Sequence, residues 1–418
     1  MLSRPIKNVG FVSTRIAGTD GVSLEIAKWV EILERNRFDC FYFAGQLSTP
    51  KSRSLLVEEA FFDQPEIKQI NEAVFGVRTR SSEISNQVQK VKDKLKEELY
   101  RFVKKFDIDL LIPENALTIP MNIPLGLAIT EFINETGIPT IAHHHDFYWE
   151  RDRFLVNACQ DYLNMAFPPD HPNIRHVVIN SLASKELSYR VGISNTIIPN
   201  VLNFEEEPAF THQKDCKLRE IVGLLPGEPF ILQPTRIVPR KWIERSIEIV
   251  SYLNLKKPAL IISHSAGDEG QDYYQRIMEY AEKHKIQLIL IDHLIGDNQH
   301  RRSKKYTIED VYRCADLITY PSGYEGFGNA FLEAIYYMKP IVVNRYSIYR
   351  VDIEPKGFDV VTIEGFATRK AITKIKRVLK DEEYRERMTL KNYELAKKYF
   401  SYEVAEEKLL YLINTFKL

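Results

Sequence analysis

Short apolar runs rich in β-branched and aromatic residues alternate with amphipathic helical patterns along the first half of the chain. Helical periodicity is clear at 22–34 and over a long charged stretch at 82–105. Strands that alternate with helices are typical of a mostly parallel sheet with helices on both faces. The apolar runs predict strands at 9–13, 39–44, 108–113, 139–144, 176–180 and 196–198.

The same alternation starts again after residue 205. The Pro-bounded stretch 199–204 is predicted to be a linker between the two halves. The second half predicts strands at 230–233, 259–263, 288–291, 317–320, 341–344 and 360–363, with helices at 243–253, 273–284, 308–314, 330–338 and 368–379. A last helix at 402–416 gathers one apolar face from Ala405, Leu409, Leu412, Ile413 and Phe416.

This organisation predicts an α/β fold with two Rossmann-like, doubly wound domains that face each other across a cleft. The first domain is expected to span 1–200, and a C-terminal helix at 400–418 is expected to cross back to it. The second domain is expected to span 205–399. In open α/β sheets, ligands bind outside the carboxyl ends of the strands, so the loops after the strands are where chemistry is expected.

Composition excludes several classes of protein. The 57 Lys and Arg residues balance the 57 Asp and Glu residues, so bulk charge gives no attraction to nucleic acid or to an anionic membrane. No apolar run approaches the roughly 18–20 residues of a membrane span, and the first residues lack a signal peptide, which predicts a cytoplasmic protein. The well-separated cysteines are predicted to be buried free thiols: Cys40, Cys159, Cys216 and Cys314.

The stretch 320–333, YPSGYEGFGNAFLE, carries the clearest chemical signal. A strand ends there, a Ser/Gly-rich turn with Ser322 follows, and a helix begins whose free N–H groups can bind a diphosphate. Gly326 and Gly328 allow the backbone to approach a ligand closely. Glu325 and Glu333 can accept hydrogen bonds from sugar hydroxyls. Together these features point to a nucleotide sugar; the alternative is an ordinary helix start.

Two further strand ends carry candidate anion-binding features. Arg236 and Lys241 follow the predicted strand 230–233 and are candidates to neutralise a leaving diphosphate. The alternative is a solvated basic turn. Gly18 and Gly21 flank a turn after the first strand, whose N–H groups are expected to face the cleft. This turn lacks the GxGxxG pattern of a dinucleotide site, and a plain loop is its alternative.

The stretch 143–153, HHHDFYWERDR, begins on a strand, so His143 and His145 are expected on one face and His144 on the other. A metal site is not predicted, because no distant Cys/His cluster completes it. Arg151 and Arg153 can bind an anionic acceptor, such as a phosphate or a carboxylate. The alternative is a surface loop held by ion pairs.

These residues together resemble glycosyltransferase family 4, the retaining nucleotide-sugar transferases of the GT-B fold. Glu325 and Glu333 match its E-x7-E signature, and Arg236 and Lys241 match its Arg…Lys pair. The stretch 199–201 resembles its interdomain linker, and the turn at 18–21 its N-terminal glycine loop. The wider pattern is most similar to branches that use small soluble acceptors: trehalose synthase, sucrose-phosphate synthase and mannosylglucosyl-phosphoglycerate synthase types.

The resemblance implies a role for each matched residue. It implies hexose transfer, glucose or mannose, from a nucleotide-diphosphate sugar to a small anionic acceptor, with no cofactor or metal. Neither nucleic acid nor stable membrane insertion is expected, and a homodimer is left open. The implied catalytic residues are His145, Arg236, Lys241 and Glu325; donor-binding residues are Gly18, Gly21, Arg236, Lys241, Ser322, Glu325, Gly326, Phe327, Gly328 and Glu333; acceptor-binding residues are Asp20, Asp146, Tyr148, Arg151 and Arg153.

The chain departs from the family pattern at several positions. Asp20 stands where a glycine is usual, and is expected to direct a carboxylate toward the acceptor. Met338 occupies the glycine position of EAxxxGxP, and Tyr346 and Tyr349 are expected to reshape the donor pocket. The resemblance therefore does not specify which nucleotide base, which hexose or which individual acceptor the protein uses.

The mechanism implied is front-face transfer with retention, in which the leaving phosphate takes the acceptor's proton. Domain closure is expected to exclude water. Competing interpretations are a nucleotide-sugar 2-epimerase, a non-catalytic nucleotide-sugar-binding protein and a transferase acting on a lipid or polysaccharide. The basic helix at 82–105 would suit a membrane surface, but its interspersed acidic residues favour a solvated face.

Overall fold

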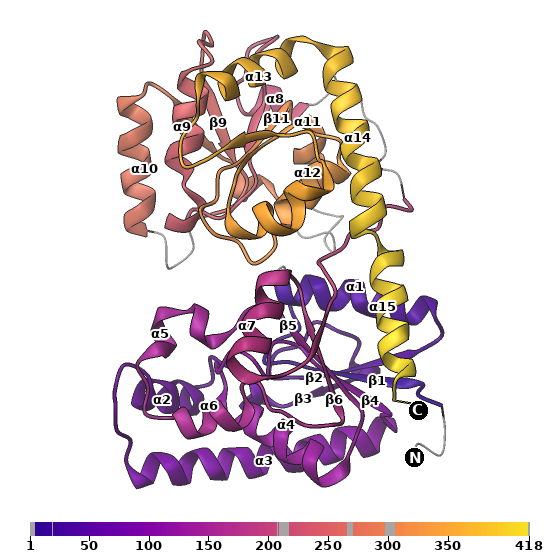
Figure 1. The fold of residues 1–418 in the computed structure, drawn as a ribbon. Helices are drawn as coiled ribbons and strands as arrows, with labels where there is room; N and C mark the ends of the chain where they lie inside the picture. The colour runs from indigo at the N-terminus through magenta and orange to yellow at the C-terminus, as the bar shows by residue number, and fades with distance from the viewer. Residues whose placement is uncertain are drawn as a thin grey trace. The chain divides into compact units, whose positions relative to one another are not determined.

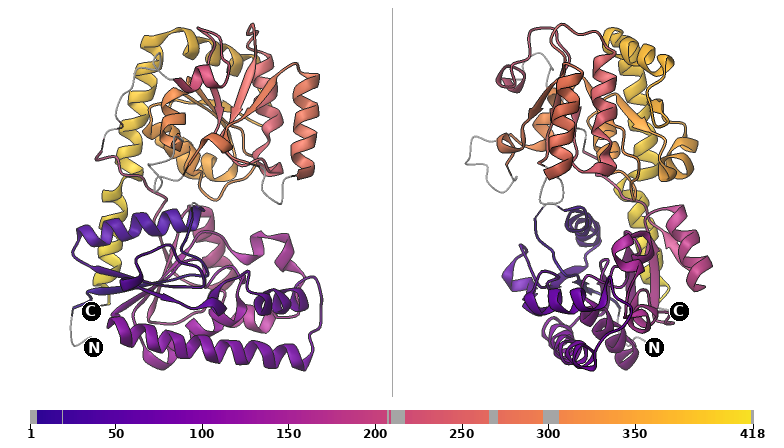
Figure 2. Two further views of the ribbon diagram at one scale, coloured as in Figure 1. Left: turned by 180° about the vertical axis from the view of Figure 1, so that it is seen from behind. Right: turned by 90° about the vertical axis from the view of Figure 1, so that its left-hand side faces the viewer.

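The chain forms two compact units, seen from three sides in Figures 1 and 2. A computed structural model describes residues 5–18, 20–206, 208, 217–265, 271–296 and 306–416. Unit 1 comprises Met1–Val201 together with Tyr402–Leu418, and unit 2 comprises Leu202–Ser401. The last helix therefore belongs to the same unit as the first strand.

Unit 1 is built on a seven-stranded sheet whose strands are all parallel, in the order β3-β2-β1-β4-β5-β6-β7. Its strands are β1 (Asn8–Val12), β2 (Asp39–Ala44), β3 (Ser54–Leu56), β4 (Leu110–Pro113), β5 (Thr140–His144), β6 (Ile174–Val178) and β7 (Asn195–Ile197). Its α-helices are α1 (Gly21–Arg35), α2 (Pro65–Val74), α3 (Ser82–Phe106), α4 (Ile123–Thr136), α5 (Asp152–Leu155), α6 (Gln160–Ala166), α7 (Ser181–Val191) and α15 (Tyr402–Asn414), with short helices η1 (Lys51–Arg53), η2 (Glu58–Ala60) and η3 (Tyr148–Glu150).

Helices cover both faces of this sheet because successive strand residues point to opposite sides. In β4, Leu111 joins a core with α3 and α4, whereas Leu110 and Ile112 join a core with α1 and α15. Figure 1 shows α3 and α4 on one side of the sheet, and α1 and α15 on the other. Leu409 of α15 packs in the core that contains Trp29 of α1, so the C-terminal helix completes this unit.

Unit 2 repeats the architecture with six parallel strands in the order β10-β9-β8-β11-β12-β13. Its strands are β8 (Ile231–Gln233), β9 (Ala259–Ile262), β10 (Gln287–Leu290), β11 (Leu317–Tyr320), β12 (Ile341–Asn344) and β13 (Val361–Ile363). Its α-helices are α8 (Lys217–Ile221), α9 (Ile243–Ser251), α10 (Gln271–Lys283), α11 (Ile308–Cys314), α12 (Asn329–Tyr336), α13 (Arg369–Lys380) and α14 (Glu382–Phe400), with shorter turns of helix at η5 (Pro239–Lys241), η6 (Asp292–Leu294), η8 (Tyr349–Ile353) and η9 (Glu354–Lys356).

The predicted α/β class with two doubly wound sheets is confirmed. Most boundaries shift by one or two residues; β6, for example, begins at Ile174, where position 176 was predicted. Several elements had no range of their own in the prediction, among them α2, α4, β3 and α14. β3 is a three-residue strand with one buried residue, and α14 has apolar residues mixed with many charged ones. Among the described helices, none is long and apolar enough to span a membrane.

The cysteine prediction is partly wrong. Cys40 and Cys159 are free and buried, as expected. Cys314, at the end of α11, is instead disulfide-bonded. Sequence separation is a poor guide to pairing, because a disulfide requires only that two Cα atoms lie within about 7 Å in the fold. Cys216 lies outside the described residues.

Met338 explains why a glycine is usual at its position. It follows α12 with a φ of +49°, in the left-handed region that helix ends favour. A residue with a Cβ atom pays roughly 1–2 kcal/mol there, whereas glycine pays little. This chain therefore keeps the helix-ending conformation at the cost of some local strain.

His144 and His176 form a buried polar pair within unit 1. His144 Nε2 lies 2.8 Å from His176 Nδ1, and its other ring nitrogen contacts the hydroxyl of Thr118. His144 thus points away from His143, as the strand alternation predicts. Burial lowers the pKa of His176 to about 4, and burial together with the nearby His176 lowers that of His144 well below its ordinary value.

This pair predicts that acid destabilises unit 1. Since the folded-state pKa of His176 lies below its unfolded value, only the unfolded chain takes up the proton between about pH 6.5 and 4. The contribution of neutral His176 to the free energy of unfolding is complete above pH 6.5. It is lost as pH falls, by roughly 2 kcal/mol at about pH 5. Urea unfolding of wild type and His176→Gln checks this: the variant should lose less stability on acidification. Equal losses of stability in wild type and His176→Gln would contradict this prediction. His293→Gln, a change at an exposed histidine, is the matched control.

Candidate active site

The chemistry-bearing residues of unit 2 lie where its strand order reverses. β8 and β11 are neighbours in the sheet, but their crossover helices lead in opposite directions along it. This topological switch leaves a crevice outside the carboxyl ends of the two strands, the usual ligand position in such folds. The basic turn that contains Lys241 follows β8, and the Glu325 segment follows β11.

Lys241 and Glu325, both buried, join the two strand ends in an ion cluster that also includes the exposed Arg240. Lys241 Nζ contacts Glu325 Oε1, and Arg240 Nη1 donates to Glu325 Oε2 at 2.8 Å. Lys241 is 8% exposed and Glu325 7% exposed, so both charges are largely removed from water. The ammonium also lies 5.2 Å from the centre of the Tyr320 ring, a cation–π contact.

This cluster keeps Glu325 ionised. Burial alone would raise the pKa of the Glu325 carboxyl, but the charges of Lys241 and Arg240 hold it below its ordinary value. Ser322 is also buried beside this group and its hydroxyl has no hydrogen bond of regular geometry to a described residue. The site therefore presents fixed charges and a buried hydroxyl in surroundings with little water, where electrostatic interactions are strong.

The backbone at the start of α12 is held in one conformation. Gly328 caps the helix with a φ of +119°, and a Cβ atom there would lie 2.4 Å from the Tyr346 hydroxyl. That hydroxyl donates to the carbonyl of Phe327 at 2.7 Å. Gly328 itself has no side chain that could cap the first turn of α12, and the N–H of Phe331 donates to the Gly328 carbonyl at 2.9 Å. The start of a helix is a usual position for an anion, because the helix dipole favours negative charge there.

Two further residues of the predicted donor set, Phe327 and Glu333, also contact protein groups. The Phe327 ring is buried and packs edge-on against Phe400, with ring centres 5.3 Å apart, so only its backbone is left for a ligand. The Glu333 carboxylate accepts a hydrogen bond from Tyr312 at 2.7 Å. Tyr312 is fully buried. Its hydroxyl contacts one of the two carboxylate oxygens of Glu333, Oε2, and holds the side chain in place.

Arg236 differs from the other cations of the turn. It is exposed, and its guanidinium makes no hydrogen bond or ion pair within the described ranges. His264, at the end of β9, lies nearby: desolvation and then the charges of Arg236 and Lys241 lower its pKa. Ser263 is within hydrogen-bond distance of His264 Nδ1, at 2.7 Å. An exposed cation at this strand end, unpaired among the described residues, suits an anionic ligand.

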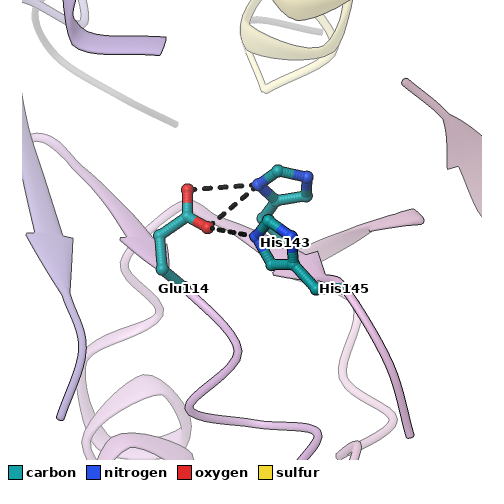
Figure 3. A group of neighbouring side chains, drawn as sticks. All are labelled: Glu114, His143 and His145. Carbon is teal, nitrogen blue, oxygen red and sulfur yellow. Dashed lines mark hydrogen bonds and ion pairs between the residues drawn. The ribbon is translucent and has the colours of Figure 1, made fainter. Parts of the chain in front are cut away.

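Unit 1 has a second buried cluster at its own switch point, between β1 and β4. Figure 3 shows the carboxylate of Glu114, which follows β4, facing two neighbouring imidazoles from the end of β5. His143 Nδ1 lies 3.0 Å from Glu114 Oε2, and His145 Nε2 lies 3.2 Å from the same oxygen. His143 stacks on Trp29 with ring centres 4.1 Å apart.

The electrostatics of this cluster favour an ionised carboxylate. Burial would raise the pKa of Glu114, but His143 and His145 lower it below its ordinary value. Burial would lower the pKa of His145, but the hydrogen bond and charge of Glu114, with smaller effects of Glu25 and Asp146, raise it. Within the described residues, this is also the group whose ligand atoms, all within 4.8 Å, could hold a metal ion.

The predicted acceptor residues lie around this cluster but are engaged with protein groups. Asp146 accepts from Asn115 at 3.0 Å and pairs with Arg151. Tyr148 accepts from a glutamine amide at 3.3 Å, and exposed Arg153 lies over Phe154. The predicted surface loop held by ion pairs is thus present at Asp146 and Arg151.

The glycine turn of unit 1 is organised by Asp20. Its carboxylate caps α1 by accepting from the N–H groups of Val22 and Ser23, and it pairs with Arg15 at 3.1 Å. Capping is a physical reason for an acid at this position, so the carboxylate is held at the helix rather than free. Gly18 has a φ of +77°, and Gly21 is the first residue of α1.

Several residues of these clusters escaped the sequence reasoning. Glu114 and Asn115 are two polar residues that directly follow a buried apolar strand. Tyr312 lies inside a helix, far from any motif. The detectable signal was position: Glu114 directly follows β4, beside β5. The prediction that His143 and His145 share one face did not reveal that Glu114 contacts both rings. Strand order cannot be obtained from periodicity.

Comparison with known proteins connects the whole chain to one class of enzyme. The profile of a family described as "Glycosyl transferases group 1" matches residues 216–395. The chain is 32% identical over 389 residues to a mannosylglucosylglycerate synthase of Petrotoga mobilis, covering 85% of this chain and 86% of that protein. It is 31% identical over 423 residues to a mannosylglucosylglycerate synthase of Thermotoga maritima, covering 93% and 96%.

Solved structures agree in fold. A glycosyltransferase from Rickettsia africae superposes with a TM-score of 0.69 at 14% identity, covering 98% of both chains. The Anabaena protein HepE, in complex with UDP and glucose, superposes with a TM-score of 0.65 at 14% identity, covering 98% of this chain and 100% of that one.

The ion cluster of unit 2 predicts a large loss of stability in Glu325→Gln. Removing one partner leaves the buried Lys241 charge uncompensated, at a cost of roughly 3–5 kcal/mol. Urea unfolding of the full chain measures this loss of stability. The double variant Lys241→Met/Glu325→Gln should recover most of it, because no buried charge then remains unpaired. An unchanged unfolding midpoint in the single variant would contradict the cluster.

Proposed function

The chain belongs to the glycosyl transferases of group 1, and we propose that it transfers a hexose, with retention, from a nucleotide-diphosphate sugar to a small anionic acceptor. One observation carries this proposal. Arg236, Lys241 and Glu325 come from the two strand ends at the switch point of unit 2, and the start of α12 follows the same turn as Glu325. This combination offers cations and N–H groups to a diphosphate, and a carboxylate to a sugar.

The donor is proposed to bind unit 2 through groups with separate tasks. Arg236 and Lys241 neutralise the diphosphate as it leaves. Glu325, with the amides of Gly326–Gly328 and the hydroxyl of Ser322, holds the hexose. Glu333, fixed by Tyr312 through one oxygen, offers the other to the ribose hydroxyls. Gly18 and Gly21, in the glycine turn of unit 1, are also proposed to bind the donor.

For the finer substrate assignment, we propose mannose as the hexose and glucosylglycerate as the acceptor. Both relatives at more than 30% identity are mannosylglucosylglycerate synthases, and the chain spans most of their length. Glucosylglycerate carries one carboxylate. Arg151 and Arg153 are exposed cations able to bind it, Arg151 after exchanging its ion pair with Asp146. Tyr148 and Asp146 are placed to contact hydroxyls of the acceptor.

The transfer is proposed to proceed on one face of the sugar. The bond between the anomeric carbon and the phosphate oxygen breaks, and a bond to the acceptor oxygen forms on the same side. The acceptor's proton passes to the departing phosphate oxygen, so no side-chain base is needed. Positioning, and stabilisation of the charge that develops on the diphosphate, then supply the acceleration. Exclusion of water limits hydrolysis of the donor.

A donor and acceptor panel tests this function. GDP-mannose, UDP-glucose and ADP-glucose are each incubated with glucosylglycerate, glycerate or a sugar phosphate, and nucleoside diphosphate release is measured. We expect release from GDP-mannose only when glucosylglycerate is present, with an α-configured product by NMR. Release without acceptor would indicate a hydrolase or epimerase. Tight donor binding without turnover would instead favour the non-catalytic interpretation.

Arg236→Ala is expected to lower kcat by about 10²–10³-fold, because a preorganised contact to the developing diphosphate charge is lost. Its thermal unfolding should stay unchanged, since the guanidinium has no partner among the residues described. Steady-state kinetics and a melting curve measure the two effects. Arg369→Ala, an exposed arginine on α13, is the matched control. A kcat equal to wild type in Arg236→Ala would remove Arg236 from the mechanism.

A further inference from the structure

Glu114 connects two imidazoles in a way that the proposed transfer leaves unexplained. Its Oε1 lies 3.2 Å from His143 Nδ1, and its Oε2 lies 3.2 Å from His145 Nε2 (Figure 3). Glu114 is 1% exposed and His143 1% exposed, so water does not supply these contacts. A carboxylate buried this deeply must be compensated by its neighbours.

An ionised carboxylate only accepts hydrogen bonds. Both facing nitrogens must therefore carry protons: Nδ1 of His143 and Nε2 of His145. The tautomer of each ring is set by the hydrogen bond made at one nitrogen. For His143, this leaves Nε2 buried, with no hydrogen-bond partner among the residues that the structure describes. For His145, it leaves Nδ1 on the side chain that is 12% exposed, the most open of the three.

The surrounding contacts hold both rings in one orientation. His143 is stacked on Trp29 of α1, nearly parallel at 17°. The main-chain N–H of His145 donates to Asn115 Oδ1 at 3.1 Å, and the N–H of Asn115 donates to the carbonyl of His143 at 2.9 Å. Glu114 and Asn115 therefore fix the side chains and the backbone of the same segment.

We propose that Glu114 is a positioning residue that fixes the ring orientation and tautomer of His145, so that His145 Nδ1 is presented to a hydroxyl of the bound sugar. This inference rests on the proposed transferase function, in which His145 contacts substrate. Glu114 itself does not touch the substrate; it acts through the imidazole, as buried acids that orient an imidazole do in other active sites.

The same three residue types also suit a metal ion. Nitrogen–oxygen separations of 3.0–3.2 Å are those of N–H···O hydrogen bonds. Ligand atoms around a tetrahedral metal ion lie at a similar separation, roughly 3.3 Å. The distances fit both arrangements, and the metal titration below distinguishes them.

A double-mutant cycle tests the proposal. Glu114→Gln is expected to lower kcat by about 10–100-fold, with KM for donor and acceptor within about threefold of wild type. His145→Ala should lower kcat further, and Glu114→Gln should cost nothing more in the His145→Ala background, because coupled residues are not additive. Equal losses in both backgrounds would show that Glu114 acts independently of His145 and would overturn the proposal.

Asp109→Asn is the matched control. Asp109 is a buried carboxylate next to the opposite end of β4, where it accepts from the N–H groups of Lys7 and Asn8 at 2.9 Å. It lies outside the proposed substrate-binding residues. Asp109→Asn should destabilise unit 1 while leaving kcat near wild type. A fall in kcat equal to that of Glu114→Gln would attribute the effect to general destabilisation and overturn the proposal.

A second measurement does not depend on the transfer reaction. Imidazole ¹⁵N spectra of histidine-labelled protein report which ring nitrogen is protonated, and His145→Ala identifies the signals of His145. We expect a ring protonated at Nε2 in wild type and a changed or exchanging pattern in Glu114→Gln, because the neutral amide replaces one acceptor oxygen with an NH₂ donor. Identical spectra would overturn the proposal even if no donor turns over. A changed spectrum without turnover would leave the positioning intact and reject the transferase function.

Added Mg²⁺, Mn²⁺ and Zn²⁺ separate this arrangement from a metal site. Chelator-treated wild type should keep its activity, and calorimetry should show no stoichiometric binding that depends on Glu114. Binding of one ion per chain that is lost in Glu114→Gln, with activity restored by that ion, would overturn the proposal.

Discussion

Each unit buries a carboxylate at the carboxyl edge of its parallel sheet, beside the point where the strand order reverses. Glu325 follows β11, which neighbours β8, and Glu114 follows β4, which neighbours β1. A buried carboxylate is costly unless paired. Unit 2 pairs its acid with the cations Lys241 and Arg240, and unit 1 pairs its acid with two imidazoles. The two chemistries follow from these pairings: one site suits an anion, and the other suits hydroxyl groups.

The pairings also explain why these sites are rigid. A buried ion pair adds little net stability, because desolvation cancels much of the attraction. Its effect is to fix groups in one geometry where water is scarce, which is what charge stabilisation during a reaction requires. Packing completes this rigidity: Tyr346 closes against Gly328, Tyr312 holds Glu333, and Trp29 stacks on His143. Arg236, exposed and unpaired within the described part of the chain, is the contrasting case, a cation left available for a ligand.

The sequence predicted the sheets well because buried parallel strands and their helices have distinct periods. It also predicted which loops matter, since residues 320–333 combine a strand end, turn glycines and two acids. Contacts between segments were out of its reach. Glu114 looks like an isolated acid after an apolar run until β4 and β5 are known to be adjacent. Asp20 seemed free to face an acceptor until its capping of α1 was seen. The disulfide at Cys314 and the left-handed Met338 likewise depend on three-dimensional placement.

The central claim is that a nucleotide-diphosphate hexose binds at the strand ends of β8 and β11. Amide hydrogen–deuterium exchange with and without GDP-mannose, at concentrations where calorimetry shows binding, tests it most directly. The account predicts slower exchange over residues 322–333 and over the turn at 236–241, with little change at the opposite edge of the same sheet. Protection confined to other segments, in the presence of demonstrated binding, would contradict it.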